Sequence, residues 1–278
     1  MKIAVLSGKG GTGKTMVSVN LATVAAPSVY VDCDVEEPNG HLYLKPENVE
    51  REAVEVLIPR SNPDKCNGCT ECVRFCRFNA LAYTLDRLKV FPEMCHSCGG
   101  CKVICPQKAI TEFPRTVGYV ESGQSGDIKI HTGIMNIGEV AGIPIIDRLS
   151  EKIPEAGNVF VDCPPGSSCS VMESIKDADF CVLVSEPTVF GAHNLNMVAE
   201  LVRTFEKPFG VILNKDIGGE RNPSEEYCLK NNIDIIGRIP FDRKLGLLSS
   251  EARIAVAEDS HFKKLFSEIL DNIKEAAQ

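Results

Sequence analysis

A glycine-rich segment near the amino terminus constrains the fold of this chain more than any other feature. Residues 8–15 read Gly-Lys-Gly-Gly-Thr-Gly-Lys-Thr and match the pattern GxxxxGK(S/T). An apolar run typical of a buried strand, residues 3–6, precedes the segment, and a helical pattern at residues 16–25 follows it. In that context glycines let backbone N–H groups surround phosphates, and the start of the helix adds positive potential. The sequence therefore predicts a nucleotide-phosphate site.

The residue types in this loop predict individual contacts. Lys14 should reach the β- and γ-phosphates, and the Thr15 hydroxyl should ligate Mg²⁺. A glycine-rich turn without a ligand is the alternative, but the match at every position and the surrounding strand and helix argue against it. The expected phosphate contacts are Gly8, Gly10, Gly11, Thr12, Gly13, Lys14 and Thr15.

Apolar runs of strand length alternate with helical patterns along most of the chain. The expected strands are residues 3–6, 29–31, 159–161, 181–184, 211–213 and 233–236. The expected helices are residues 16–25, 142–153, 168–177, 190–205, 222–230 and 260–276. This alternation predicts an α/β fold with a mostly parallel, doubly wound sheet covered by helices on both faces.

The alternation stops at about residue 60 and resumes near residue 114. Residues 61–113 contain eight cysteines and many turn residues. They carry seven Lys and Arg against five Asp and Glu, in a chain whose net charge is −8. We predict a small inserted domain at 61–113, within a nucleotide-binding domain made of residues 1–60 and 114–278. A short hairpin at 117–131, turning at residues 122–126, should lead back into the main sheet.

Two cysteine runs of identical spacing, C-x₂-C-x₂-C-x₃-C, lie 29 residues apart in this insert. The spacing is that of bacterial two-cluster ferredoxins, in which the fourth cysteine of each run ligates the other cluster. It predicts a ferredoxin-like α+β domain with two [4Fe–4S] clusters. The alternative is zinc, which four evenly tight cysteines fit less well than a cube. The expected ligand sets are Cys66, Cys69, Cys72 and Cys105 for one cluster, and Cys95, Cys98, Cys101 and Cys76 for the other.

The phosphate loop contains a second lysine, Lys9, which the general pattern does not require. In this respect the chain resembles the MinD/ParA superfamily of P-loop ATPases, related to the nitrogenase iron protein and to Mrp/Nbp35-type ATPases. With its insert, it resembles superfamily members that contain a two-cluster ferredoxin domain. The resemblance implies ATP hydrolysis by an ATP-dependent homodimer in which Lys9 crosses to the partner's nucleotide. A solvated surface charge is the alternative for this lysine.

The same resemblance implies roles for residues that follow two of the strands. Asp34 lies in a segment similar to switch I and would orient or activate the attacking water, with Asp32 as the alternative. Asp162 lies in a segment similar to Walker B and would hold Mg²⁺. The backbone N–H of Gly166 would sense the γ-phosphate.

Recognition of the base is implied by a segment after a later strand. Asn214 corresponds to a residue that contacts adenine in MinD-type ATPases, and Pro240 would line the same pocket. Ile217 stands where a guanine-reading motif needs aspartate, so ATP is preferred over GTP. A simple turn residue is the alternative for Asn214.

Five cysteines lie outside the two runs. Cys169 stands seven residues after Asp162, where a cysteine of the nitrogenase iron protein helps to hold a cluster that bridges two subunits. No convincing second bridging cysteine occurs near residues 131–145, so a buried or redox-responsive thiol is favoured. Cys181 lies in an apolar run and is interpreted as a small core residue. The five are Cys33, Cys163, Cys169, Cys181 and Cys228.

Composition and charge exclude several classes of partner. A net charge of −8 argues against nucleic acid as the main partner, because phosphate neutralisation needs clustered Lys and Arg. No signal peptide or long apolar run is visible, and the polar face of the helix at 260–276 mixes both charge signs. We therefore expect a cytoplasmic protein without a stable membrane anchor, in which cysteines are not disulfides.

The favoured function is an ATP-binding and hydrolysing iron–sulfur protein that couples MgATP turnover to electron transfer through two clusters, with a redox protein as partner. One alternative is an ATPase for cluster assembly or transfer, although Cys228 stands alone where such ATPases usually have CxxC. The other alternative is a positioning or partner-switching ATPase whose clusters are structural or sense redox state.

Overall fold

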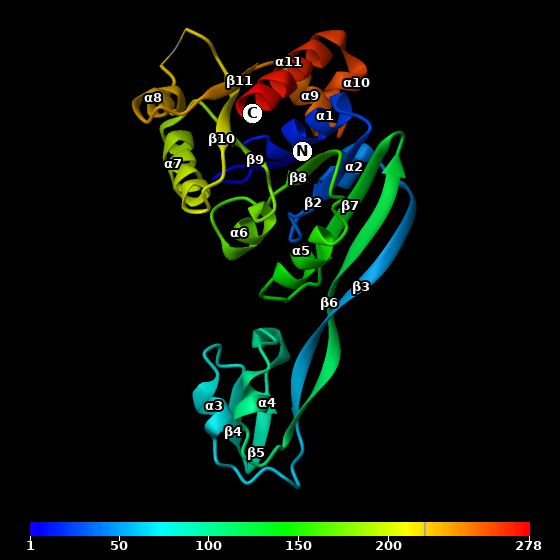
Figure 1. Cartoon of the computed structure of the whole chain (residues 1–278), viewed down its shortest axis with the longest axis vertical. Helices are drawn as coiled ribbons and strands as arrows, with labels where there is room; N and C mark the ends of the chain where they lie inside the picture. Colours follow the sequence, from blue (N-terminus) through cyan, green and yellow to red (C-terminus); the bar gives the residue numbers. More distant parts are fainter. Residues whose placement is uncertain (220) are drawn as a thin grey trace.

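The computed structural model describes residues 1–219 and 221–278 (Figure 1). The strands are β1 (Lys2–Leu6), β2 (Ser28–Asp32), β3 (Glu47–Ser61), β4 (Leu81–Thr84), β5 (Arg87–Val90), β6 (Ile110–Ser125), β7 (Ile128–Met135), β8 (Asn158–Asp162), β9 (Phe180–Ser185), β10 (Phe209–Asp216) and β11 (Ile235–Pro240). The helices are α1 (Lys14–Val24), α2 (Gly40–Leu44), α3 (Glu71–Phe75), α4 (Gly100–Ile104), α5 (Ile143–Ser150), α6 (Cys169–Ile175), α7 (Val189–Thr204), α8 (Pro223–Lys230), α9 (Arg243–Ser250), α10 (Ala255–Glu258) and α11 (Ser260–Ala276), with a 3₁₀ turn at Pro92–Met94.

One large sheet has the strand order β11-β10-β9-β1-β8-β2-β7-β6-β3. From β11 to β7 every neighbouring pair is parallel, whereas β6 and β3 pair antiparallel at one edge. The predicted fold class, a mostly parallel α/β sheet, is confirmed.

Side-chain alternation along the central strand explains why helices cover both faces. Ile3 and Val5 of β1 pack with residues of α1, α9, α10 and α11, whereas Ala4 and Leu6 pack with α5, α6, α7 and α8. Successive side chains of a strand point to opposite faces, so an entirely apolar strand needs an apolar partner on each side. The doubly wound arrangement follows from this requirement.

The C-terminal helix α11 belongs to one of these covering layers. Phe262, Phe266, Ile269, Leu270 and Ile273 are buried in the core that α11 shares with α1 and β11. The apolar face of this helix thus packs inside the molecule. Across the two described ranges, the helices are all too short or too polar to cross a membrane.

The sequence did not predict β3 or residues 110–116 of β6, the two longest strands. β3 and β6 pair from Glu47 opposite Gln124 to Ser61 opposite Ile110, and this ribbon leads from the main sheet to a small unit (Figure 1). The predicted hairpin at 117–131 exists but is longer than expected. Residues 122–125 continue β6 opposite β7, and the chain turns only at residues 126–127, where Gly126 has φ 53°.

The last strand of the sheet also differs from its prediction. β11 begins at Ile235 rather than at Ile233. The backbone N–H of Ile233 donates instead to the carbonyl of Cys228 at 3.0 Å, which closes the end of α8. The apolar side chain of Ile233 is buried without belonging to a strand.

The small unit at the end of the ribbon contains α3, α4 and the two-stranded sheet β4-β5. α3 and α4 begin 29 residues apart, as the two cysteine runs do. Its buried residues Cys72, Leu81 and Ile110 form a core separate from the two cores of the main sheet.

Candidate functional site

The glycine-rich loop connects β1 to α1 at the carboxyl edge of the sheet. Gly13 immediately precedes α1 with φ 89°, a conformation that L side chains rarely adopt. A Cβ at Gly13 would also lie 2.3 Å from Nδ2 of Asn214. Glycine is therefore required here both by the backbone and by the close approach of Asn214.

Lys14 and Thr15 both contact Asp162 at the end of β8. Nζ of Lys14 lies 2.7 Å from Oδ1 of Asp162, and the Thr15 hydroxyl donates to Oδ2 at 2.7 Å. The hydroxyl of Tyr30, buried in β2, donates to the same Oδ2 at 3.0 Å. Burial opposes the charge of Lys14, but Asp162, Asp32 and Asp34 together hold its pKa above the ordinary value. These three aspartates thus keep Lys14 protonated.

The two aspartates after β2 have different surroundings. Asp32 is fully buried and accepts hydrogen bonds from the N–H groups of Asp34 at 3.2 Å and Gly40 at 2.8 Å. Burial, helped by the charge of Asp162, raises the pKa of Asp32 to about 8. Asp34 is partly exposed, lies 3.8 Å from Nζ of Lys14, and has its pKa raised by burial to about 6. Asp32 therefore holds the backbone of the segment that follows β2, whereas Asp34 faces Lys14 of the glycine-rich loop.

A cavity of about 560 Å³ opens beside the loop. It is lined by residues 9–16, by the segment after β2 that includes Asp34, and by Pro164 and Pro165. A second cavity of about 330 Å³ adjoins Gly11 and Gly13 and is lined by Asn214 and Pro240. Nδ2 of Asn214 donates to the carbonyl of Thr12 at 2.7 Å. The residues expected to contact phosphates and base therefore lie in adjacent cavities, except Gly8, which lines neither and packs closely against the backbone of Asn194.

Gly166 lies after β8 with φ 89°. Its backbone N–H donates to the carbonyl of Ser7 at 2.9 Å. This N–H must exchange that partner before it can donate to a phosphate.

Lys9 is held by contacts that the sequence reading missed. Its Nζ lies 2.6 Å from Oε2 of Glu186, which follows β9. Nζ of Lys215 lies 2.5 Å from the other carboxylate oxygen of Glu186 and donates to the carbonyl of Gly11 at 3.0 Å. These two ion pairs lower the pKa of Glu186 against the opposing effect of its burial. Lys9 is therefore paired within its own chain.

Glu186 and Tyr30 gave only weak signals in the sequence. Glu186 follows an apolar strand run, and polar residues at the carboxyl ends of parallel strands commonly line the ligand site. Tyr30 lies inside a run that reads simply as a buried strand. That position predicts burial without indicating the contact with Asp162.

The eight cysteines of the small unit surround two cavities. A small cavity of about 20 Å³ is lined by Cys66, Cys69, Cys72 and Cys105. An open cavity of about 500 Å³, which also borders Leu57 and Pro59 of β3, is lined by Cys76, Cys95, Cys98 and Cys101. Each cavity thus takes three thiols from one run and the fourth from the other.

The thiols within each group lie close enough to influence one another. Burial raises the pKa of Cys72, and negative charge on Cys105 and Cys66 raises it further. Burial likewise raises the pKa of Cys101 to about 11, with Cys95 and Cys98 adding to the effect. Binding to iron would replace the protons that these crowded thiols retain.

The spacing of these groups bears on the zinc alternative. Within residues 1–219 and 221–278, no three His, Cys, Asp or Glu side chains converge closely enough to ligate one metal ion. A tetrahedral zinc site needs such convergence, whereas a cube distributes its ligands over four iron atoms. Each of the two cavities offers four thiols, which is the number of ligands that a cube needs.

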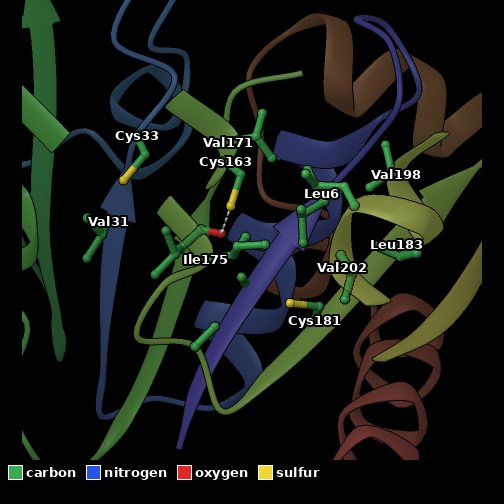
Figure 2. Close-up of a cluster of buried hydrophobic side chains, with 14 of the residues drawn as sticks. Leu6, Val31, Cys33, Cys163, Val171, Ile175, Cys181, Leu183, Val198 and Val202 are labelled. Atoms are coloured by element: carbon green, nitrogen blue, oxygen red, sulfur yellow. Dashed lines mark hydrogen bonds between the residues drawn. The ribbon is translucent and has the colours of Figure 1, made fainter. Parts of the chain in front are cut away.

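The cysteines outside the two runs are mostly buried. Figure 2 shows Cys33, Cys163 and Cys181 among aliphatic side chains, with the Cys163 thiol directed to the carbonyl of Val161 at 3.7 Å. Cys228 is also buried, and burial raises the pKa of its thiol to about 11. Cys169, at the start of α6, is exposed. Cys181 is therefore a core residue, as predicted, and for Cys169 the buried alternative is wrong.

The parallel sheet, the loop before α1 and the aspartates facing it define a P-loop ATPase. The chain belongs to the CobQ/CobB/MinD/ParA nucleotide binding domain family, whose profile matches residues 3–254. The predicted family and the predicted ATPase activity are confirmed by this match.

Three similar proteins extend the comparison. An uncharacterized protein of Methanocaldococcus jannaschii is 29% identical over 99% of this chain and 97% of its own. An iron-sulfur cluster carrier protein of Methanococcus maripaludis is 26% identical over 98% of this chain and 85% of its own. The structure of the septum site-determining protein MinD of Pyrococcus horikoshii, complexed with Mg-ADP, superposes with a TM-score of 0.61 at 18% identity, covering 99% of this chain and 96% of that one. The last likeness supports the fold.

Proposed function

We propose that this chain is an ATP-dependent iron–sulfur protein that couples MgATP turnover to electron transfer. Residues 1–60 and 114–278 form the ATPase domain, and residues 61–113 form a ferredoxin-like domain with two [4Fe–4S] clusters. The observation that carries the proposal is the grouping of eight thiols around two cavities, three plus one in each.

The cluster ligands follow from this grouping. Cys66, Cys69, Cys72 and Cys105 hold one cluster, and Cys76, Cys95, Cys98 and Cys101 hold the other. When bound, each cluster supplies a one-electron store whose potential depends on nearby charge, hydrogen bonds and solvent exposure. The second site borders the larger cavity, which favours it as the point of exchange with a redox partner.

The roles at the nucleotide site follow from the contacts of each residue. Lys14 binds the β- and γ-phosphates, and Thr15 and Asp162 hold Mg²⁺. Asp34, rather than the buried Asp32, orients the attacking water, because it faces Lys14 from the partly exposed side. The Gly166 N–H exchanges Ser7 for the γ-phosphate. The loop glycines surround the phosphates, while Asn214 and Pro240 contact adenine.

ATP-dependent dimerisation would complete this site. Lys9 would leave Glu186 and reach the nucleotide of the partner subunit. The ion pair with Glu186 is partly exposed, so its loss costs little compared with a new contact to phosphate.

Electron and atom balance set the overall reaction. The cysteine sets would hold the group that stores one electron, so the reaction would require a reduced one-electron donor protein and an oxidised acceptor protein. Each ATP consumes one water and yields ADP and phosphate. Nucleotide turnover changes the switch segments and thereby the properties of the clusters.

A second candidate is the transfer of assembled clusters, favoured by the 26% identity to an iron-sulfur cluster carrier protein. Against it, the thiol of Cys228 is buried. A labile shared cluster requires accessible ligands.

Anaerobic reduction of the full chain, with and without MgATP, separates the two candidates. A nucleotide-dependent change in the electron paramagnetic resonance (EPR) signal of the reduced clusters supports electron transfer. Loss of iron to an apo-acceptor protein, with no such change, supports cluster transfer and contradicts the first proposal.

A further inference from the structure

We propose that the ion pair between Arg115 and Glu139 is the link through which the nucleotide site controls the cluster site beside Cys95. The inference rests on the proposed function, because it requires clusters in the insert. It adds the residues through which a change at one site would reach the other.

The link begins at the segment that follows Asp34. The carbonyl of Val35 accepts a hydrogen bond from the N–H of Met135, at the end of β7, at 2.9 Å. The buried side chain of Val35 also packs between Gly133 and Gly142. A Cβ on either glycine would lie only 2.6 Å or 2.4 Å from Val35 methyl groups. Movement of the segment after Asp34 should therefore move Met135 and Gly142, the two ends between which residues 136–142 run.

Residues 136–142 carry Glu139 toward the ribbon. The backbone N–H of Asn136 donates to the carbonyl of Val117 at 2.9 Å, and its side chain donates to the carbonyl of Thr116 at 3.1 Å. The two carboxylate oxygens of Glu139 then accept hydrogen bonds from Nη1 and Nη2 of Arg115, at 3.0 and 2.5 Å. The loop is thus fastened to β6 at both of these points.

Arg115 also reaches the small unit. Its Nη1 donates to the carbonyl of Pro92 at 3.3 Å, and Pro92 precedes Cys95 by three residues. One side chain therefore contacts both the ATPase domain and the segment that leads into the second cluster site.

The burial of this pair distinguishes it from other ion pairs of the ribbon. The side chain of Glu139 is 8% exposed and that of Arg115 is 23% exposed. Arg51 and Glu121, on the same ribbon, are 53% and 30% exposed, and their nearest charged atoms are 3.7 Å apart. A partly buried bidentate pair holds its two side chains together more firmly than an exposed pair, because it is less screened by water and its geometry is fixed by two hydrogen bonds.

These contacts suggest how nucleotide state would reach the cluster. Engagement of the segment after Asp34 by MgATP would move Val35 and the base of residues 136–142, and Glu139 would carry the guanidinium with it. A positive charge close to a cluster favours the reduced, more negative state, so its displacement changes the reduction potential.

The test uses the anaerobically purified full chain and three variants, R115Q, E139Q and the control R51Q. The midpoint potential and EPR spectrum of the dithionite-reduced clusters are measured with MgADP, with a non-hydrolysable MgATP analogue, and without nucleotide. R115Q removes the link and the charge beside Cys95. E139Q removes the link and leaves the charge. Neither residue contacts the nucleotide site, so ATPase rates should stay within about twofold of wild type.

We expect a nucleotide-dependent shift in the wild type and in R51Q, and its loss in both R115Q and E139Q. R115Q alone should also lower the potential without nucleotide. A shift that persists in E139Q overturns the link and leaves the proposed function intact. Clusters that show no nucleotide response in the wild type overturn the coupling itself, and absence of clusters overturns the proposed function.

Discussion

Nζ of Lys9 lies 2.6 Å from the carboxylate of Glu186 in the same chain. The side chain of Glu186 is 11% exposed and is shared with Lys215, so it is fixed more firmly than the lysine. In the proposed dimer Lys9 serves the partner's nucleotide. The pair with Glu186 therefore competes directly with dimerisation.

Replacing Glu186 with Gln should favour the dimer. A partly exposed ion pair contributes about 0.5–1 kcal/mol. Dimerisation breaks one such pair in each subunit, so ATP-dependent dimerisation of the variant should tighten roughly five- to thirtyfold. Analytical ultracentrifugation with a non-hydrolysable ATP analogue measures the change. The control is Glu225→Gln, which breaks an ion pair with Arg238 away from the loop. Unchanged or weaker dimerisation in the Glu186 variant would contradict the competition.

Replacing Asp34 with Asn should abolish hydrolysis and raise stability at neutral pH. Burial raises the pKa of Asp34 from 3.8 to about 6. A raised pKa favours folding fully below pH 3.8, and this contribution is lost as pH rises through 6. The variant should therefore gain roughly 1–3 kcal/mol relative to wild type between pH 4 and pH 7.

Denaturant unfolding at several pH values tests this second effect, and nucleotide titration checks that the variant still binds MgATP. The expected profile is a stability difference that grows with pH. A stability difference that does not change with pH would show that the pKa of Asp34 is not raised. Retained hydrolysis would contradict the proposed catalytic role of Asp34.

Replacing Tyr30 with Phe should disturb Asp162 while the fold is kept. The change removes the hydrogen bond to Oδ2, whose other donor is the Thr15 hydroxyl. Loss of a buried hydrogen bond costs about 1–2 kcal/mol. We therefore expect the Mg²⁺ concentration that gives half-maximal ATP hydrolysis to rise several-fold. Tyr227→Phe, which removes a hydrogen bond to Asn196, is the matched control. Equal Mg²⁺ dependence in both variants would deny Tyr30 a positioning role.

Replacing Cys105 with Ala should affect the same cluster as replacing Cys66, although the two lie in different runs. Both line the small cavity of about 20 Å³, whereas Cys101 lines the larger one. EPR spectra of the reduced Cys66 and Cys105 variants should therefore resemble each other and differ from that of the Cys101 variant. Cys181→Ala, a change in the core, should leave both signals intact. If the spectrum of the Cys105 variant matched that of the Cys101 variant instead, Cys105 would belong to the other ligand set.

The local motifs were predictable because their chemistry depends on residues close in sequence. The loop at residues 8–15 and the residues after β2 and β8 lie at the ends of buried strands, and parallel strands bring those ends to one edge. The cysteine runs were predictable for the same reason, because most ligands of each set lie close together in the sequence.

The ribbon and the ion pairs were not predictable in this way. β3 is largely exposed along residues 47–53 and lacks an apolar alternation there, so pairing with β6 decides its conformation. Glu186 reaches Lys9 and Tyr30 reaches Asp162 only after distant strands have paired. The local sequence gives only a weak signal for such contacts.

The most direct test of the account is iron and sulfide analysis of anaerobically purified protein, combined with EPR spectra recorded with and without MgATP. The account predicts about eight iron atoms per chain and a reduced-cluster signal that changes with nucleotide. Folded protein without iron would contradict it, as would two clusters whose signal is indifferent to MgATP.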